Sequence, residues 1–284
     1  MEQQYIIKNV QSFEPVHIFE CGQCFRWNQE EDGSYTGIFK NNVINVKKED
    51  KDVIFTGICE GHIKEICTEY FDLNTSYEEI KDKLSKIDKY LENSIEYGTG
   101  IRILKQDLWE TLISFVISAN NNIPRIKTII ERISKKYGDK ITFKVKEYYT
   151  FPTPEQMADA TVQDFRDLGL GFRDVRVYET VQRTLKKEID LDNLKNEINV
   201  EKLREELLKI PGVGPKVADC IMLFSLQKYE VFPVDVWVRR VISELYFENK
   251  EQQPKVIQKF AKEHYGDLAG LAQQYLFYWR RDMA

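Results

Sequence analysis

The sequence predicts an α+β protein in which a small antiparallel sheet is followed by a larger helical part. Short β-rich runs separated by Asn, Asp and Gly occupy residues 24–56, and from about residue 62 the apolar positions recur with a helical period. No internal repeat and no low-complexity linker separates the two parts. We therefore expect two closely packed portions, residues 1–99 and residues 100–284.

The predicted sheet is an antiparallel meander. The turn-rich segment 30–34, the Asn41-Asn42 pair and the polar segment 49–52 separate β-rich runs, as short connections between neighbouring strands require. These runs are Cys24–Trp27, Tyr35–Phe39, Val43–Val46 and Val53–Thr56.

Helical periodicity dominates the rest of the chain. Ser76 and Glu79 have the spacing of a capping box, which predicts the start of a helix there. Further helical segments are predicted at Asp107–Ser118, Arg125–Tyr137, Arg173–Lys187, Val200–Leu208, Pro215–Leu226, Val236–Phe247 and Pro254–His264.

Composition limits the class of protein. Of the 284 residues, 42% are hydrophobic and 31% are charged, which argues against a disordered or fibrous chain. No apolar run approaches the ~20 residues of a membrane span, and no signal peptide is visible at the start. We expect a monomeric, cytoplasmic protein without a membrane partner.

The net charge of −5 is unevenly distributed along the chain. Residues 1–100 carry 11 basic and 19 acidic side chains, whereas the remaining residues carry 30 basic and 27 acidic ones. The first part therefore has a net charge of −8 and the second a net charge of +3. Any contact with nucleic acid must depend on locally placed groups in the second part rather than on a general basic field.

The five cysteines, at positions 21, 24, 59, 67 and 220, are expected to be reduced thiols, because no export signal precedes them. Cys21 and Cys24 form the single C-x-x-C motif, but no second ligand pair has the spacing of a zinc site. Semi-buried thiols are therefore favoured over structural zinc. The cysteine cluster that an iron–sulfur centre needs does not follow Cys220.

The segment 207–220 contains the most informative motif. A helix is predicted to end at Pro211, where Gly212 and Gly214 permit positive φ angles on either side of Val213. Pro215 suits the first turn of the next helix. The outward amides of such a hairpin can bind phosphate, although a plain connection between two helices is an equally good reading of this motif alone.

Two residues near this hairpin can carry chemistry. Lys216 falls in the first turn of the second helix, where the helix dipole disfavours the charged amine and leaves a nucleophile. Asp235 lies in Val231-Phe-Pro-Val-Asp235 and could stabilise a positive charge close to Lys216. The alternatives are a solvated surface lysine and a simple helix N-cap.

These motifs carry a family resemblance. Ile210-Pro-Gly-Val-Gly with Lys216 and a later Pro-Val-Asp235 resembles the helix–hairpin–helix/Gly-Pro-Asp superfamily of DNA base-excision glycosylases. Further segments resemble its 8-oxoguanine glycosylases of the OGG type, and together they span residues 22–277. These are Gly22–Trp27, Ser118–Arg125, Leu168–Arg173, Lys216–Cys220 and Ala272–Phe277.

The resemblance implies a bifunctional enzyme that acts on double-stranded DNA. Lys216 matches the nucleophile that attacks C1′ of the damaged nucleotide, forms an imine and allows β-elimination at the abasic site. Asp235 matches the carboxylate that stabilises the sugar cation. The helical portion is then a helix–hairpin–helix glycosylase region, with Gly212, Val213 and Gly214 as its phosphate-binding hairpin.

The resemblance also implies two separate recognition sites. In the first, Gly22 matches the carbonyl that accepts from N7–H of 8-oxoguanine, Cys220 and Phe277 match the sandwich around the flipped base, and Gln273 matches the reader of its Watson–Crick edge. In the second, the residues matching those at the cytosine left behind are Asn120, Arg125 and Arg173, with Phe172 as the wedge. Taken alone, each could equally be a turn, core or surface residue.

Some features depart from eukaryotic relatives. Trp237 replaces a histidine that commonly follows the motif aspartate, and no organelle-targeting pattern is visible, which indicates a bacterial-type, nucleoid-associated member. The resemblance implies no required cofactor or catalytic metal, but relatives hold a cation on hairpin carbonyls. A sibling glycosylase for another lesion and a non-catalytic helix–hairpin–helix module are the alternatives.

Overall fold

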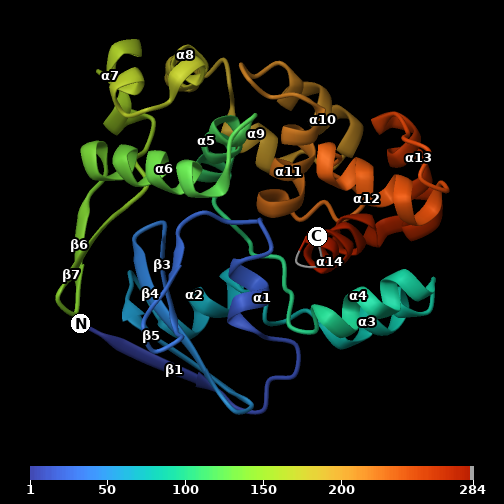
Figure 1. Cartoon of the computed structure of the whole chain (residues 1–284). Helices are drawn as coiled ribbons and strands as arrows, with labels where there is room; N and C mark the ends of the chain where they lie inside the picture. The colour runs from blue at the N-terminus through green and yellow to red at the C-terminus, as the bar shows by residue number, and fades with distance from the viewer. Residues whose placement is uncertain (282–284) are drawn as a thin grey trace.

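A five-stranded antiparallel sheet forms the first part of the computed structural model, which describes residues 1–281 (Figure 1). The strand order is β1-β5-β4-β3-β2, so the expected meander is confirmed from β2 to β5. The strands are β1 (Gln3–Ile7), β2 (Trp27–Gln29), β3 (Tyr35–Phe39), β4 (Asn42–Glu49) and β5 (Asp52–Ile58).

Two features of the sheet differ from the sequence prediction. The run predicted from Cys24 pairs only from Trp27, which lies opposite Gly37, because the residues before Trp27 form a loop that approaches the helices. The chain start, for which no strand was predicted, forms β1 and pairs with β5, with Tyr5 opposite Phe55. This pairing joins residues about fifty positions apart, which local sequence patterns do not report.

Two helices pack on the apolar residues of the sheet, α1 (Pro15–Phe19) and α2 (Ile63–Tyr70). Phe19 stacks on Trp27 with ring centroids 4.1 Å apart, and Tyr70 stacks on Phe39 at 3.7 Å. A second hairpin, β6 (Lys140–Phe143) with β7 (Lys146–Tyr149), was not predicted. Its Phe143 packs on apolar residues of β3 and β4, which attaches this hairpin to the sheet.

Helices form most of the remaining chain. They are α3 (Tyr77–Ser85), α4 (Lys89–Tyr97), α5 (Leu108–Ser118), α6 (Ile123–Tyr137), α7 (Val162–Asp167), α8 (Asp174–Leu185), α9 (Leu191–Asn196), α10 (Val200–Leu208), α11 (Pro215–Leu226), α12 (Val236–Tyr246), α13 (Pro254–Tyr265) and α14 (Ala269–Arg281). Three 3₁₀ turns complete the set: η1 (Glu155–Met157), η2 (Gly171–Arg173) and η3 (Gly266–Leu268).

Side-chain caps decide where the helices begin. Asn122 accepts from the amide of Arg125 at 3.0 Å, so α6 starts at Ile123, two residues before its predicted start. Ser76 accepts from the amide of Glu79, which is half of the predicted capping box. The complete box instead lies at Thr161 and Asp164, before α7.

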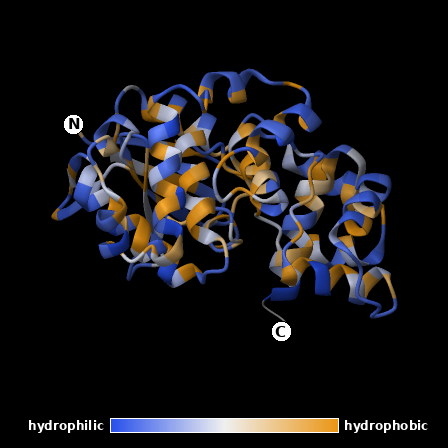
Figure 2. Ribbon diagram, turned by 90° about the horizontal axis from the view of Figure 1, so that it is seen from above, coloured by the Kyte–Doolittle hydropathy of each residue, from blue (hydrophilic) through white to orange (hydrophobic). Residues whose placement is uncertain are grey.

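Helices α3 and α4 of the first portion join the apolar core of the helical portion, whereas the sheet has a buried cluster of its own. Tyr77 and Leu84 of α3 belong to the same buried cluster as Leu112 of α5 and Ile221 of α11. Figure 2 shows hydrophobic residues concentrated on the helix faces that meet inside, with hydrophilic ones outside. No helix within residues 1–281 has the length and apolar character of a membrane span. The end of the predicted second portion, residues 282–284, lies outside the described residues.

Candidate active site

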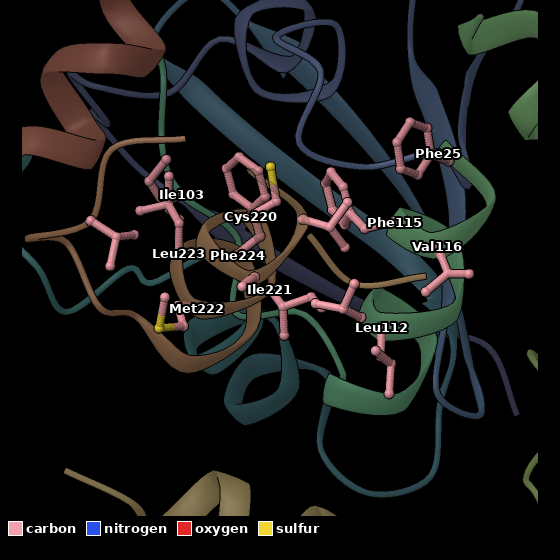
Figure 3. Close-up of a cluster of buried hydrophobic side chains, with 14 of the residues drawn as sticks. Phe25, Ile103, Leu112, Phe115, Val116, Cys220, Ile221, Met222, Leu223 and Phe224 are labelled. Atoms are coloured by element: carbon pink, nitrogen blue, oxygen red, sulfur yellow. The ribbon is translucent and has the colours of Figure 1, made fainter. Parts of the chain in front are cut away.

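Helix α11 places two of the predicted site residues on one face. Lys216 and Cys220 are four residues apart, one turn along the helix. Helix α11 packs against α5, and Figure 3 shows Cys220 and Phe224 of α11 in the same buried cluster as Phe115 of α5. The face of α11 that carries Lys216 and Cys220 therefore belongs to a helix packed against α5.

The hairpin before α11 differs in one respect from the prediction. Gly212 has φ +83°, but Gly214 has φ −98° and ψ 179°, which is extended backbone. Gly214 takes this conformation because it is the N-cap residue of α11. The amide of Val213 donates to the carbonyl of Ile210 at 3.1 Å, so that amide closes the turn. A Cβ on Gly214 would meet no atom within 4 Å, so this side of the hairpin is open.

Gly22 lies on a loop that the side chain of Gln23 anchors. The buried amide of Gln23 donates to the carbonyls of Ile18 and Arg102 at 2.9 and 2.7 Å, and its oxygen accepts from the amide of Leu104 at 2.9 Å. Gly22 itself has φ +84°, a conformation that favours glycine. The loop is therefore fixed to the scaffold immediately beside the residue predicted to contact the lesion.

The last helix, α14, brings Gln273 and Phe277 to the site. Gln273, Gln274 and Phe277 share one face of α14, whereas Tyr275 and Tyr278 are buried in the core. Of the aromatic residues near the end of the helix, Phe277 is thus the one that faces the site.

Asp235 is both a helix cap and a site residue. Its Oδ1 accepts from the amide of Val238 at 2.7 Å, which confirms that it caps α12. This bond fixes the carboxylate at the end of the extended segment 231–234, beside the cavity that Lys216 also lines. Asp235 can therefore cap α12 and also present its carboxylate to the cavity.

A cavity of about 50 Å³ brings together six of the predicted residues. They are Gly22, Lys216, Cys220, Asp235, Gln273 and Phe277, and they come from parts of the chain that are up to 255 positions apart. The other lining residues are Cys21, Phe115, Phe224, Pro233, Val238 and Gln274. This volume holds only a few water molecules, so a purine could enter only after side chains move.

The walls of the cavity are mostly apolar. The Nζ of Lys216 lies 5.2 Å from the ring centroid of Phe115, within range of a cation–π contact. Burial raises the pKa of Cys220 to about 11, although Lys216 opposes this shift, and burial raises the pKa of Cys21 to about 12. Both thiols therefore stay neutral near pH 7.

The four residues predicted to contact the undamaged strand form a second group. Arg173 is only 2% exposed and donates to the carbonyls of Ala119 and Asn120 at 2.7 and 2.6 Å. Its guanidinium also lies over the ring of Phe172, 4.2 Å from the centroid, and Phe172 is 56% exposed. Exposed Arg125 donates to the carbonyl of Gly169 at 3.1 Å.

Matches to family models cover almost the whole chain. Residues 5–112 match the 8-oxoguanine DNA glycosylase N-terminal domain. Residues 113–266 match the HhH-GPD superfamily of base excision DNA repair proteins, where the hairpin, Lys216 and Asp235 lie. This chain belongs to the HhH-GPD superfamily.

Solved and curated HhH-GPD relatives agree with this assignment. A Clostridium acetobutylicum 8-oxoguanine glycosylase/lyase, bound to double-stranded DNA with cytosine opposite 8-oxoguanine, is 46% identical with a TM-score of 0.94, covering 100% of this chain and 98% of that chain. MBOgg1 in complex with a low-affinity DNA ligand is 44% identical with a TM-score of 0.95, covering 99% and 96%. A probable N-glycosylase/DNA lyase from Methanothermobacter thermautotrophicus is 33% identical over 227 residues, 73% of this chain and 71% of the relative.

Several residues at the two candidate sites of this HhH-GPD protein were not predicted from the sequence. Phe115 lies in a strongly apolar helix, so its contact with Lys216 could not be distinguished from core packing. In the sequence, Gln274 was indicated only by its position next to Gln273 in the segment Ala272–Phe277. Arg176 was not singled out, yet its guanidinium lies 5.3 Å from the ring centroid of Phe172, and its Cδ would be 2.9 Å from a Cβ on Gly212.

Within residues 1–281, no three His, Cys, Asp or Glu side chains are grouped so that they could hold a metal ion. All five cysteines are free thiols, and Cys59 is the one that is not buried.

Proposed function

We propose that this chain is an 8-oxoguanine DNA glycosylase and abasic-site lyase of base excision repair. One observation carries the proposal: a lysine, a carboxylate and four candidate base-binding residues meet in one cavity. The relatives named above as 8-oxoguanine glycosylase/lyase and N-glycosylase/DNA lyase support it. A module that only binds phosphate would have no use for such a cavity.

Lys216 is the proposed nucleophile. Its amine attacks C1′ of the damaged nucleotide as the C1′–N9 bond breaks, and the electron pair of that bond leaves with the base. The base takes up the proton that the amine releases on forming the new C1′–N bond. The sugar ring then opens to an imine, and β-elimination expels the 3′ phosphate. Asp235, fixed by its bond to the amide of Val238, stabilises the positive charge that develops on the sugar.

The lesion would occupy the cavity after its side chains move apart. Cys220, whose thiol stays neutral, and Phe277 would face the two sides of the flipped base, and Gln273 would read its Watson–Crick edge. Gly22 would accept from N7–H through its backbone carbonyl. Extrusion of the base costs a few kcal/mol, which these contacts must offset.

The second group of residues would act on the strand left behind. Phe172 is exposed and could fill the gap, while Arg125 and Arg173 donate to cytosine beside Asn120. Arg173 now donates to backbone carbonyls of residues 119, 120 and 170, so contact with cytosine requires it to release at least one of them. We propose 8-oxoguanine opposite cytosine as the substrate.

The hairpin would bind a DNA phosphate through the amides of Gly212 and Gly214, because the amide of Val213 already closes the turn. Amine and carboxylate supply the proposed chemistry, so it requires no cofactor. A cation implied by the resemblance would sit on hairpin carbonyls. Two carbonyls beside the turn already accept one hydrogen bond each, that of Lys209 from Arg183 and that of Ile210 from Val213. No step of the proposed chemistry depends on a cation.

Residues 1–99 and 100–284 are proposed as the two portions of this enzyme, the first contributing Gly22 and the second the helix–hairpin–helix region. The proposed site comes from a single chain, so a monomer suffices. Chromosomal DNA is its place of action, which in a bacterium is the nucleoid.

Borohydride trapping on an 8-oxoguanine duplex tests the proposal. The wild-type protein should form a covalent protein–DNA adduct, and Lys216→Gln should abolish it while duplex binding persists, because the hairpin is intact. Lys202→Gln is the matched control, since this surface lysine of α10 pairs with Glu197 at 2.8 Å. A wild-type protein that binds but never traps would support a binding module, and trapping by Lys216→Gln would exclude Lys216 as the nucleophile.

A further inference from the structure

Two neighbouring glutamines form a buried amide pair in the wall of the cavity. Gln273 and Gln274 are 5% and 3% exposed, and the Nε2 of Gln274 donates to the Oε1 of Gln273 at 2.8 Å. Both side chains line the cavity together with Lys216 and Phe277. The oxygen of Gln273 therefore already accepts one hydrogen bond from its neighbour.

The other end of this pair carries an unused acceptor. The Oε1 of Gln274 is buried and has no hydrogen-bond partner within residues 1–281. Buried polar groups are normally paired, because removing one from water without a partner is unfavourable. An acceptor left in the wall of a binding cavity thus indicates a ligand that brings a donor.

The Watson–Crick edge of 8-oxoguanine supplies such donors. It presents N1–H and the exocyclic 2-amino group as donors and O6 as an acceptor. Because the oxygen of Gln273 accepts from Gln274, the Nε2 of Gln273 can donate to the acceptor of the base, and the Oε1 of Gln274 can accept from one of its donors. Two amides can therefore match an edge on which donors and an acceptor stand side by side.

We propose that Gln274 is a second specificity-determining residue whose Oε1 accepts a hydrogen bond from the 2-amino group of the lesion. The inference rests on the proposed function. It adds a reason why the pocket would select oxidised guanine over oxidised purines that lack the 2-amino group. A site with a buried acceptor rejects a ligand that lacks the donor, because the acceptor then stays unpaired.

Single-turnover excision of 8-oxoguanine and 8-oxohypoxanthine, each opposite cytosine, tests this inference. The two bases differ only in the 2-amino group. Wild-type protein should excise 8-oxoguanine about five to ten times faster, the effect of one buried hydrogen bond. Gln274→Met, which keeps the length of the side chain but also loses the bond to Gln273, should slow excision of 8-oxoguanine by that factor more than it slows excision of 8-oxohypoxanthine. Gln182→Met is the control, since the exposed side-chain amide of Gln182, on α8, donates to the carbonyl of Ala158.

The outcomes distinguish a failure of this inference from a failure of the proposed function. Equal wild-type rates on both bases would overturn the inference without use of any variant. An unchanged ratio in Gln274→Met, or an equal loss on both bases, would overturn it as well, because Gln274 would then only support the cavity. Wild-type protein that excises neither base would instead overturn the proposed function.

Discussion

Gly22→Ala is the sharpest test of how the lesion pocket is built. Gly22 has φ +84°, and a Cβ there would lie 3.3 Å from Cε1 and 3.8 Å from Cζ of Phe277. The substitution therefore introduces two separate perturbations. The backbone is strained in the left-handed region, and the ring proposed to cover the flipped base must move by a few tenths of an ångström.

The two perturbations have different consequences. A side chain at such a φ costs about 1–2 kcal/mol of folding free energy. Displacement of Phe277 and of the Gly22 carbonyl instead misplaces the bound substrate. Misplacement by about 1 Å can cost roughly a hundredfold in rate, so we expect about a tenfold slower excision from a smaller shift. The loss should be the same whichever base lies opposite the lesion.

Single-turnover excision of 8-oxoguanine opposite cytosine and opposite adenine measures this effect. Gly33→Ala is the matched control, because Gly33 has φ +82° and a Cβ there meets nothing within 4 Å. Both variants should lose a similar amount of thermal stability, but only Gly22→Ala should lose activity. Wild-type excision by Gly22→Ala, or an equal slowing in Gly33→Ala, would refute the argument.

Three further predictions follow from the geometry. Asp235→Asn should keep duplex binding and slow single-turnover excision by at least tenfold, because an amide can still cap α12 but cannot neutralise a cation; unchanged turnover would leave Asp235 as a cap alone. Arg125→Ala should narrow the preference for cytosine over adenine opposite the lesion without a change in melting temperature. Arg173→Ala should narrow the same preference and also lower the melting temperature, since buried Arg173 ties the loop at Asn120 to η2. An unchanged preference in both variants would contradict the assignment. Burial raises the pKa of Asp219 to about 6 from 3.8, although Arg204 opposes this shift. The folded state therefore binds this proton more tightly than the unfolded one, and the stabilisation that the proton contributes is lost as the pH rises from about 4 to 6. Asp219→Asn should flatten the melting temperature over that interval relative to wild type, and an identical slope in both proteins would contradict this.

Much of the fold follows from local patterns in the sequence. The helix starts at Leu108, Val200 and Val236 lie directly after Asp107, Asn199 and Asp235, each of which accepts from an amide three residues ahead. A cap depends on a few neighbouring residues, so it can be predicted without knowledge of the packing. The edge position of β1 could not be predicted, because it depends on a partner about fifty residues away.

The candidate site divides in the same way. The hairpin at Gly212 and the helix start at Pro215 follow from conformational preferences of glycine and proline, and the order of the motifs carried the family resemblance. The extended backbone of Gly214, the burial of Arg173 and the amide pair of Gln273 and Gln274 did not follow. Each depends on which side chains the fold places nearby.

The sequence by itself determined the α+β class, the meander, the ends of seven helices to within two residues and the chemical types of the candidate site residues. Only the tertiary structure decided that Gly22 and Phe277 meet, that Lys216 lies over the ring of Phe115, and that one acceptor in the cavity wall is unpaired. The reason is physical. Caps and periodicity arise from interactions within a few residues, whereas a cavity is the space left when distant segments pack, and its shape depends on all of them at once.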